Sequence, residues 1–193
     1  MIEVIATHGA RGITHRLIDA HLGFAEGVTS YYYPRRTALL DAGFTRLFEN
    51  GIAEFNLCYK PVLERLEAGE PIDIDTMAVC AFRHGELLVQ PSRRNSTIAR
   101  LEFYLLATRD PELRAAQLRL RRVHFDLTAE IFANLGCRNP KRASAELAIR
   151  SRGDYVTFFL APSFEEHPRN VAYYTALIRH IIDVSNLAAD TGA

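Results

Sequence analysis

The chain has 193 residues, of which 48% are hydrophobic and 24% are charged, as in an ordinary globular protein with a sizeable core. Its 23 basic and 23 acidic residues cancel, which counts mildly against a protein that binds nucleic acid through its overall charge. The three cysteines match no metal-finger spacing, no apolar run is long enough for a membrane span, and the N-terminus lacks a secretory signal, so we expect a cytoplasmic protein without metal or cofactor.

Apolar residues recur mostly at intervals of three and four, which predicts an all-α fold. The expected helices cover residues 2–8, 14–22, 25–32, 35–67, 73–89, 91–109, 112–135, 140–160 and 169–187. Thr14 is a good N-cap for the second helix and Gly23 a good residue to end it, while Pro34 stops the third. The first three helices are much shorter than the rest, which predicts a small domain over residues 1–45 and a larger helical domain over residues 46–193.

The second and third expected helices are short and joined at a glycine, which is typical of a helix-turn-helix. The buried stripe of the first is expected to contain Leu17, Ile18 and Leu22. Phe24, in the turn, is expected to fill the small core. The residues that we expect to face a DNA major groove are Glu26, Val28, Ser30 and Tyr31.

The stretch "GITHRLIDAHLGFAEGVTSYYYPRRTALLDAG", residues 12–43, carries a recognisable pattern. A Thr-capped helix is followed by a turn, a helix that ends in aromatic residues, a basic pair and a Leu-Leu pair. This stretch resembles the DNA-binding domain of TetR-family transcriptional regulators. The resemblance implies a homodimeric, ligand-responsive repressor that binds a palindromic double-stranded DNA operator, with a C-terminal domain that takes a small-molecule effector and dimerises through its last two helices.

Several residues of this stretch are candidates for DNA contact. They are Thr14, His15, Arg16, Glu26, Val28, Ser30, Tyr31, Tyr32 and Arg36. Arg36 matches a position that contacts phosphate, and a tyrosine hydroxyl can also donate to a phosphate oxygen. Tyr33 is expected to pack where the family has a core phenylalanine, Tyr31 is expected to reach DNA, and both roles stay open for Tyr32. Thr14 is equally consistent with a helix cap.

The C-terminal helices contain an apolar stripe and several aromatic residues. The stripe consists of Val171, Tyr174, Ile178, Ile181 and Ile182, and the helix facing it is expected to supply Leu147, Tyr155, Phe158 and Phe159. These residues suit either a dimer interface or the core of one chain. The candidates for an effector pocket are Phe55, Tyr59, Phe82, Phe103, Tyr104, His124 and Phe125, because ligand pockets are mostly apolar with few polar groups.

The sequence carries no nucleophile elbow, phosphate-binding loop, HExxH motif or paired-carboxylate signature, so we do not expect an enzyme. A different hypothesis is a helical ligand-binding or scaffold protein that has lost DNA binding. The neutral net charge favours it, whereas the intact pattern from Thr14 to Arg36 argues against it.

Overall fold

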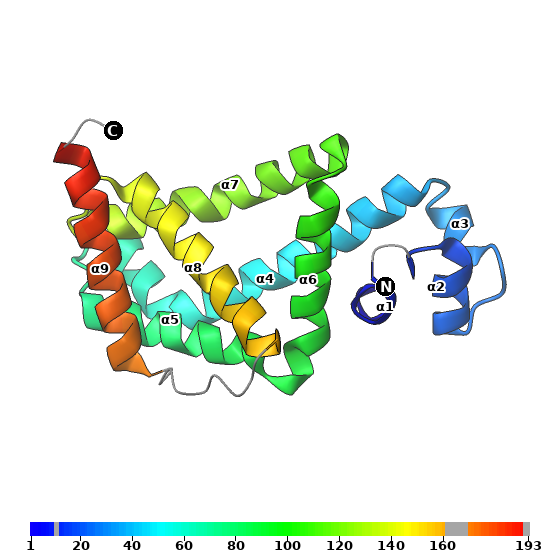
Figure 1. The fold of residues 1–193 in the computed structure, drawn as a ribbon, viewed down its shortest axis with the longest axis horizontal. Coiled ribbons are helices and arrows are strands. Elements are labelled where there is room, and N and C mark those ends of the chain that lie inside the picture. Colours follow the sequence, from blue (N-terminus) through cyan, green and yellow to red (C-terminus); the bar gives the residue numbers. More distant parts are fainter. Residues whose placement is uncertain (10–11, 161–169, 191–193) are drawn as a thin grey trace. The chain divides into compact units, whose positions relative to one another are not determined.

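The computed structural model describes residues 1–9, 12–160 and 170–190, apart from the side chains of residues 154, 155, 158–160 and 188–190. The helices in this part are α1 (Ile2–His8), α2 (His15–Leu22), α3 (Val28–Tyr32), α4 (Arg36–Glu67), α5 (Ile74–Val89), η2 (Pro91–Arg93), α6 (Arg94–Ala107), α7 (Pro111–Asn134), α8 (Pro140–Leu160) and α9 (Val171–Asp190) (Figure 1). No strand occurs among the described residues, and the predicted all-α fold is confirmed.

Three of the expected helices differ in extent from those observed. The last extends over Val171–Asp190 instead of residues 169–187. The third begins at Val28 instead of residue 25, because its N-cap Gly27 has a left-handed φ of 100° that cannot continue a helix. The helix expected over residues 91–109 is divided into the 3-10 turn η2 and α6. Other boundaries agree more closely, since Thr14 caps α2 and Gly23 ends it with a left-handed φ of 68°.

The chain divides into two compact units. Unit 1 contains Met1–Gly51 and Gln90–Arg121, and unit 2 contains Ile52–Val89 and Arg122–Ala193. Helix α4 passes from unit 1 into unit 2 directly after Gly51, and α7 does so after Arg121. The functional boundary at residue 45 stays a prediction.

Unit 1 has a core of its own, made by α1, α2, the first half of α4, α6 and the start of α7. The buried apolar residues are Val4, Ile5, Ile13, Ile18, Leu39, Leu40, Phe44, Leu47, Ala99, Phe103, Ala107 and Leu113. The rings of Phe44 and Phe103 lie 5.3 Å apart, so α4 and α6 contribute to the same layer. Burying one such large apolar side chain contributes on the order of 1.5–3 kcal/mol. Residues of α6 are therefore as much part of this core as residues of the short N-terminal helices.

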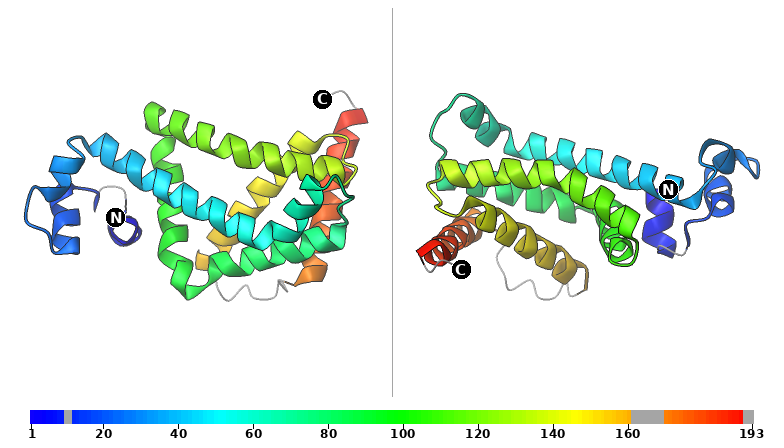
Figure 2. Two further views of the ribbon diagram at one scale, coloured as in Figure 1. Left: turned by 180° about the vertical axis from the view of Figure 1, so that it is seen from behind. Right: turned by 90° about the horizontal axis from the view of Figure 1, so that it is seen from above.

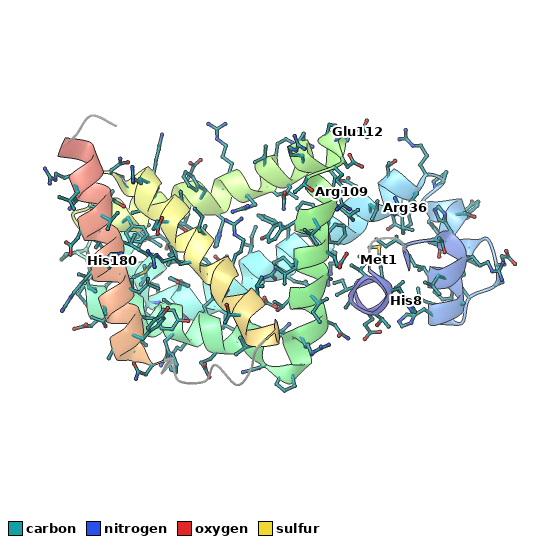
Figure 3. The ribbon with its side chains drawn as sticks, in the orientation of Figure 1. Met1, His8, Arg36, Arg109, Glu112 and His180 are labelled. Carbon is teal, nitrogen blue, oxygen red and sulfur yellow. The ribbon has the colours of Figure 1, made fainter. Side chains whose placement is uncertain are left out.

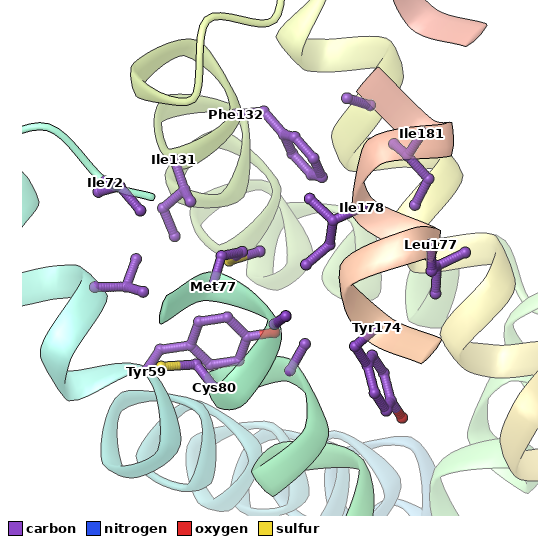
Figure 4. Packing of buried hydrophobic residues seen from close by; sticks show 14 of the residues in the cluster. Tyr59, Ile72, Met77, Cys80, Ile131, Phe132, Tyr174, Leu177, Ile178 and Ile181 are labelled. Carbon is purple, nitrogen blue, oxygen red and sulfur yellow. The ribbon is translucent and has the colours of Figure 1, made fainter. Parts of the chain in front are cut away.

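Unit 2 has a second core, in which α9 packs along α5 and against α8 (Figures 2 and 4). Tyr174, Leu177, Ile178 and Ile181 of α9 follow one another on its buried side, and Ile178 and Ile181 are completely buried. The apolar stripe expected on this helix is therefore part of the core of a single chain. Of the residues expected to face it, Leu147 packs against this core, and the side chains of Tyr155, Phe158 and Phe159 lie outside the described residues.

Candidate DNA-binding surface and ligand cavity

A buried carboxylate joins α2 to the start of α3. Asp19 is only 2% exposed, and its carboxylate accepts hydrogen bonds from the amide of Gly27 at 2.9 Å and the amide of Thr29 at 2.8 Å. The hydroxyl of Thr29 donates a further short hydrogen bond to the same carboxylate. These bonds, led by that from the Thr29 hydroxyl, lower the pKa of Asp19 although its burial acts in the opposite direction. One buried polar group thus connects the two short helices through three hydrogen bonds.

Sequence reasoning missed both Asp19 and Thr29. The available signal was an aspartate beside Ile18 on the buried side of α2, followed after the turn by Gly27 and Thr29. A buried carboxylate requires hydrogen-bond donors, and an exposed glycine turn offers backbone amides.

The first turn of α2 is also tied to its neighbours. The Thr14 hydroxyl accepts from the amide of Leu17 at 3.2 Å, which makes Thr14 an N-cap as expected. The imidazole Nε2 of His15 lies 2.6 Å from the carbonyl oxygen of Tyr33, and Nε of Arg36 donates to the carbonyl oxygen of Ile13 at 3.1 Å. His15 and Arg36 therefore each connect separate segments of unit 1 through a hydrogen bond to a backbone carbonyl oxygen.

The aromatic residues of this region face outward. Tyr31 is 80% exposed and Tyr32 71% exposed, with their rings edge to face at 5.2 Å. Tyr33 is also exposed, and so are Phe24 and Leu22. The expected core positions of these last three residues are wrong, because the turn from Gly23 to Gly27 leads the chain away from the core before α3 begins.

The other DNA-contact candidates lie on or beside these elements. Arg16 is exposed on the first turn of α2. Glu26 is exposed in the turn and does not belong to α3, which starts with the half-buried Val28. Ser30 is half-buried, and its hydroxyl donates to the carbonyl oxygen of Gly27 at 2.9 Å. Among the DNA-contact candidates, the exposed side chains that can donate hydrogen bonds are thus those of Thr14, Arg16, Tyr31, Tyr32 and Arg36. Figure 3 shows Arg36 at the start of α4.

The candidates for an effector site separate into two sets. Phe55 and Tyr59 of α4 are stacked at 4.1 Å, and His124 lies edge to face on Phe55 at 4.1 Å. Phe82 lies 6.2 Å from Tyr174 in the same unit, and the half-buried Phe125 accepts at its carbonyl oxygen from the hydroxyl of Ser144. The second set belongs to unit 1: Phe103 is part of its core, and the ring of Tyr104 lies 5.5 Å from the guanidinium of Arg121.

A cavity of about 20 Å³ lies in unit 2. Its walls include Tyr59 from α4, His84 and Gly85 from α5, Leu147 and Ser151 from α8, and Tyr174 from α9. His84 lies edge to face on both Phe55 and Tyr59, at 5.8 and 5.9 Å, so the cavity adjoins the aromatic cluster. Of the predicted residues only Tyr59 lines it. The others were missed because the remaining walls come from three more helices, with three residues from α5, two from α8 and one from α9, which no local pattern reveals.

Other kinds of site receive no support from the described part of the chain. There, no group of three or more His, Cys, Asp or Glu side chains is placed to hold a metal ion. The thiols of Cys58, Cys80 and Cys137 are free and buried, and burial raises the pKa of each, so they are poor nucleophiles. None of the described helices combines the length and hydrophobicity that crossing a bilayer requires.

Comparisons with known proteins agree with this architecture. The family model described as "Tetracyclin repressor-like, C-terminal domain" matches residues 78–184, more than half of the chain. A transcriptional regulator from Rhodococcus sp. Rha1 has a similar structure, with a TM-score of 0.68 and 15% identity over 95% of this chain and 90% of that chain. A TetR-family member from Streptomyces coelicolor A3 gives a TM-score of 0.67 and 20% identity over 93% and 92% of the two chains. No curated protein matches the chain.

Proposed function

The chain belongs to the TetR family of transcriptional regulators, and from this premise we propose that it is a ligand-responsive repressor that binds a palindromic DNA operator as a homodimer. We place it in the cytoplasm with the DNA, and we assign it no catalytic role. The observation that carries the proposal is the helix-turn-helix joined by Asp19, which has hydrogen-bond donors on its outer surface.

The exposed residues of this motif suit the two kinds of contact that a DNA-binding protein needs. Arg16, Tyr31, Tyr32 and Arg36 are the proposed phosphate contacts, since guanidinium and hydroxyl groups are the usual donors to phosphate oxygens. Thr14 and His15 stand at the N-terminus of α2, where the helix dipole favours an anion. The proposed base contacts are Glu26 in the turn, and Val28 and Ser30 in the first turn of α3.

A homodimer follows from the geometry of operators, because one short helix reads few bases and a two-fold dimer reads two half-sites. Helices α8 and α9 offer a surface for it. Ile149 of α8 and Leu187 of α9 are large apolar side chains that are 62% and 66% exposed in the single chain. The guanidinium of Arg150 on α8 lies 3.5 Å from the imidazole of His180 on α9, so the exposed sides of the two helices adjoin. Figure 3 shows His180 on α9. We propose that a second copy of the chain covers this surface.

The effector site of this proposal lies in unit 2, at the cavity and the cluster of Phe55, Tyr59 and His124 beside it. Phe82 and Phe125 belong to the same unit and stay candidates. Phe103 and Tyr104 lie in unit 1, where Phe103 contributes to the core, so they are the weaker candidates.

A mobility-shift titration tests the proposal, with the DNA upstream of the protein's own gene as probe and a shuffled fragment of equal length as control. We expect tighter binding to the upstream fragment, and weaker binding to both fragments when Tyr31 and Tyr32 are both replaced by alanine, because phosphate contacts add affinity without reading sequence. Equal and weak binding to both fragments would favour the other hypothesis, a helical ligand-binding protein that has lost DNA binding.

A further inference from the structure

We propose that the cavity in unit 2 binds a small, uncharged aromatic molecule that carries a hydroxyl group, of the phenol class. The claim that such a ligand controls DNA binding rests on the proposed function. The claim that the cavity binds the ligand is independent of the proposed function.

The cavity joins four helices at one point. Its described lining comes from α4, α5, α8 and α9, and Tyr174 of α9 packs directly on Gly85 of α5. A methyl group at Gly85 would overlap the Tyr174 hydroxyl, so the tyrosine reaches this position only because residue 85 has no side chain. A ligand here would touch helices that are far apart in sequence.

The rings around the cavity favour a planar ligand. Tyr59 and Tyr174 contribute phenol rings and His84 an imidazole ring, and aromatic rings stack or meet edge to face with one another. Phe55 stacks on Tyr59 at 4.1 Å, and His84 and His124 each meet Phe55 edge to face, so further rings adjoin the wall that Tyr59 provides. A saturated ring of equal size has no π-system, so it cannot form these stacked or edge-to-face contacts with the walls.

The polar atoms of the cavity favour a hydroxyl group on the ligand. The hydroxyl of Ser151 donates its proton to the carbonyl oxygen of Leu147 at 2.8 Å. A hydroxyl that already donates can still accept, so Ser151 presents lone pairs to a ligand that brings its own donor. A phenolic O–H is such a donor.

Charge and size restrict the ligand further. The lining residues that the structure describes include no Lys, Arg, Asp or Glu, and His84 is their one titratable nitrogen base, so a charged ligand would lose its hydration with at most one imidazole as an ionic partner. The volume of about 20 Å³ holds roughly one water molecule, so even a single ring must displace the surrounding side chains. A bulky, multi-ring compound would require much larger movements of the same four helices.

Isothermal titration calorimetry on the full-length protein without DNA tests the site directly. The probes are phenol, anisole (which lacks the donor), cyclohexanol (which lacks the aromatic ring) and benzoate (which is charged). We expect phenol to bind at least tenfold more tightly than the other three. The proposal would be overturned if benzoate bound as tightly as phenol or more tightly. It would also be overturned if phenol gave no heat of binding up to about 10 mM, a concentration on the order of the weakest specific binding.

The role of Ser151 is tested with Ser151→Ala. This variant should weaken phenol binding about fivefold, the effect of one hydrogen bond, and leave anisole binding unchanged. Thr157→Ala is the matched control, because Thr157 is exposed on the same helix and its hydroxyl makes the same kind of bond, to the carbonyl oxygen of Gly153 at 2.9 Å. Equal effects of the two variants on phenol binding would show that Ser151 is not a ligand contact.

A mobility shift with and without phenol then separates the two claims. Phenol binding with no change in operator affinity would leave the site standing and remove its regulatory role. Failure of the protein to bind any operator would contradict the proposed function, and the calorimetry would still decide whether the cavity binds phenol.

Discussion

The carboxylate of Asp19 accepts hydrogen bonds from both the amide and the hydroxyl of Thr29, so a single buried side chain of α2 positions the first turn of α3. Helix α3 has only five residues and is too short to be stable alone. Its orientation therefore depends on this contact more than on its own helical hydrogen bonds.

Replacing Asp19 by Asn should loosen α3 and reduce operator affinity. An amide group offers one acceptor oxygen where the carboxylate offers two, so at least one donor from Gly27 or Thr29 would lose its partner. Mobility shifts measure the loss, and Thr29→Val, which removes only the hydroxyl, should have a smaller effect. Unchanged operator affinity in Asp19→Asn would show that the contact does not position α3.

The same contact predicts a pH dependence of stability. The pKa of Asp19 is lower in the folded protein than in the unfolded chain, so the unfolded chain binds more protons in acid. The stabilisation should be complete above the ordinary aspartate pKa of about 4 and should disappear as the pH falls through the lower, folded value. Thermal unfolding from neutral to acidic pH should therefore show the difference between wild type and Asp19→Asn shrinking in acid. A constant difference would contradict this linkage.

Loss of Arg36 should weaken binding to all DNA sequences alike. Arg36→Gln removes one positive charge at the proposed phosphate contact. The plot of the logarithm of the binding constant against the logarithm of the salt concentration should therefore become less steep by about one unit. Arg36→Lys restores the charge but cannot reproduce the bond from Nε to the carbonyl oxygen of Ile13, so it should recover the slope and only part of the affinity. A changed sequence preference with an unchanged slope would assign Arg36 to base recognition instead.

Glutamate at Ile149 and Leu187 together should convert the proposed dimer into a monomer. Both side chains are exposed in the single chain, so the change should leave its fold intact while placing charge between the two copies. Light scattering gives the mass, and Leu57→Glu, at a 72% exposed leucine on α4, is the control. A wild-type chain that is already monomeric at micromolar concentration would refute the dimer. Substitutions at Ile178 or Ile181 are unsuitable, because both belong to the core of one chain.

Gly51→Ala should alter the response to an effector but not the affinity for the operator. Helix α4 passes between the two units directly after Gly51, and glycine is the softest residue in a helix interior. An alanine methyl would lie 3.2 Å from the guanidinium end of Arg100, a flexible group that can give way. Operator titrations with and without effector measure the coupling, typically 1–3 kcal/mol. If the wild type and Gly51→Ala showed the same coupling between effector and operator, Gly51 would be excluded as the point at which α4 bends.

Local signals predicted the helices well and the long-range contacts poorly. Thr14 and Gly23 act on the turns next to them, so their caps could be predicted from neighbouring residues alone. The stripe of Ile178 and Ile181 predicted a buried side of α9 but could not say whether the same chain or a second copy buries it. Asp19 could not be assigned because its partners follow a turn whose path depends on the positive φ of Gly27. The cavity could not be predicted either, because its walls come from four helices that are far apart in the sequence.

The core of unit 1 also limits how this regulator can be recombined. Ala99, Phe103 and Ala107 of α6 complete a core whose other members lie mostly before residue 51. A fragment ending there would leave the apolar side of α1 and the first half of α4 open to water. A hybrid regulator that takes over the proposed DNA-binding helices should therefore carry residues 90–121 along with the N-terminal segment, and a simple exchange of N-termini should give an insoluble product.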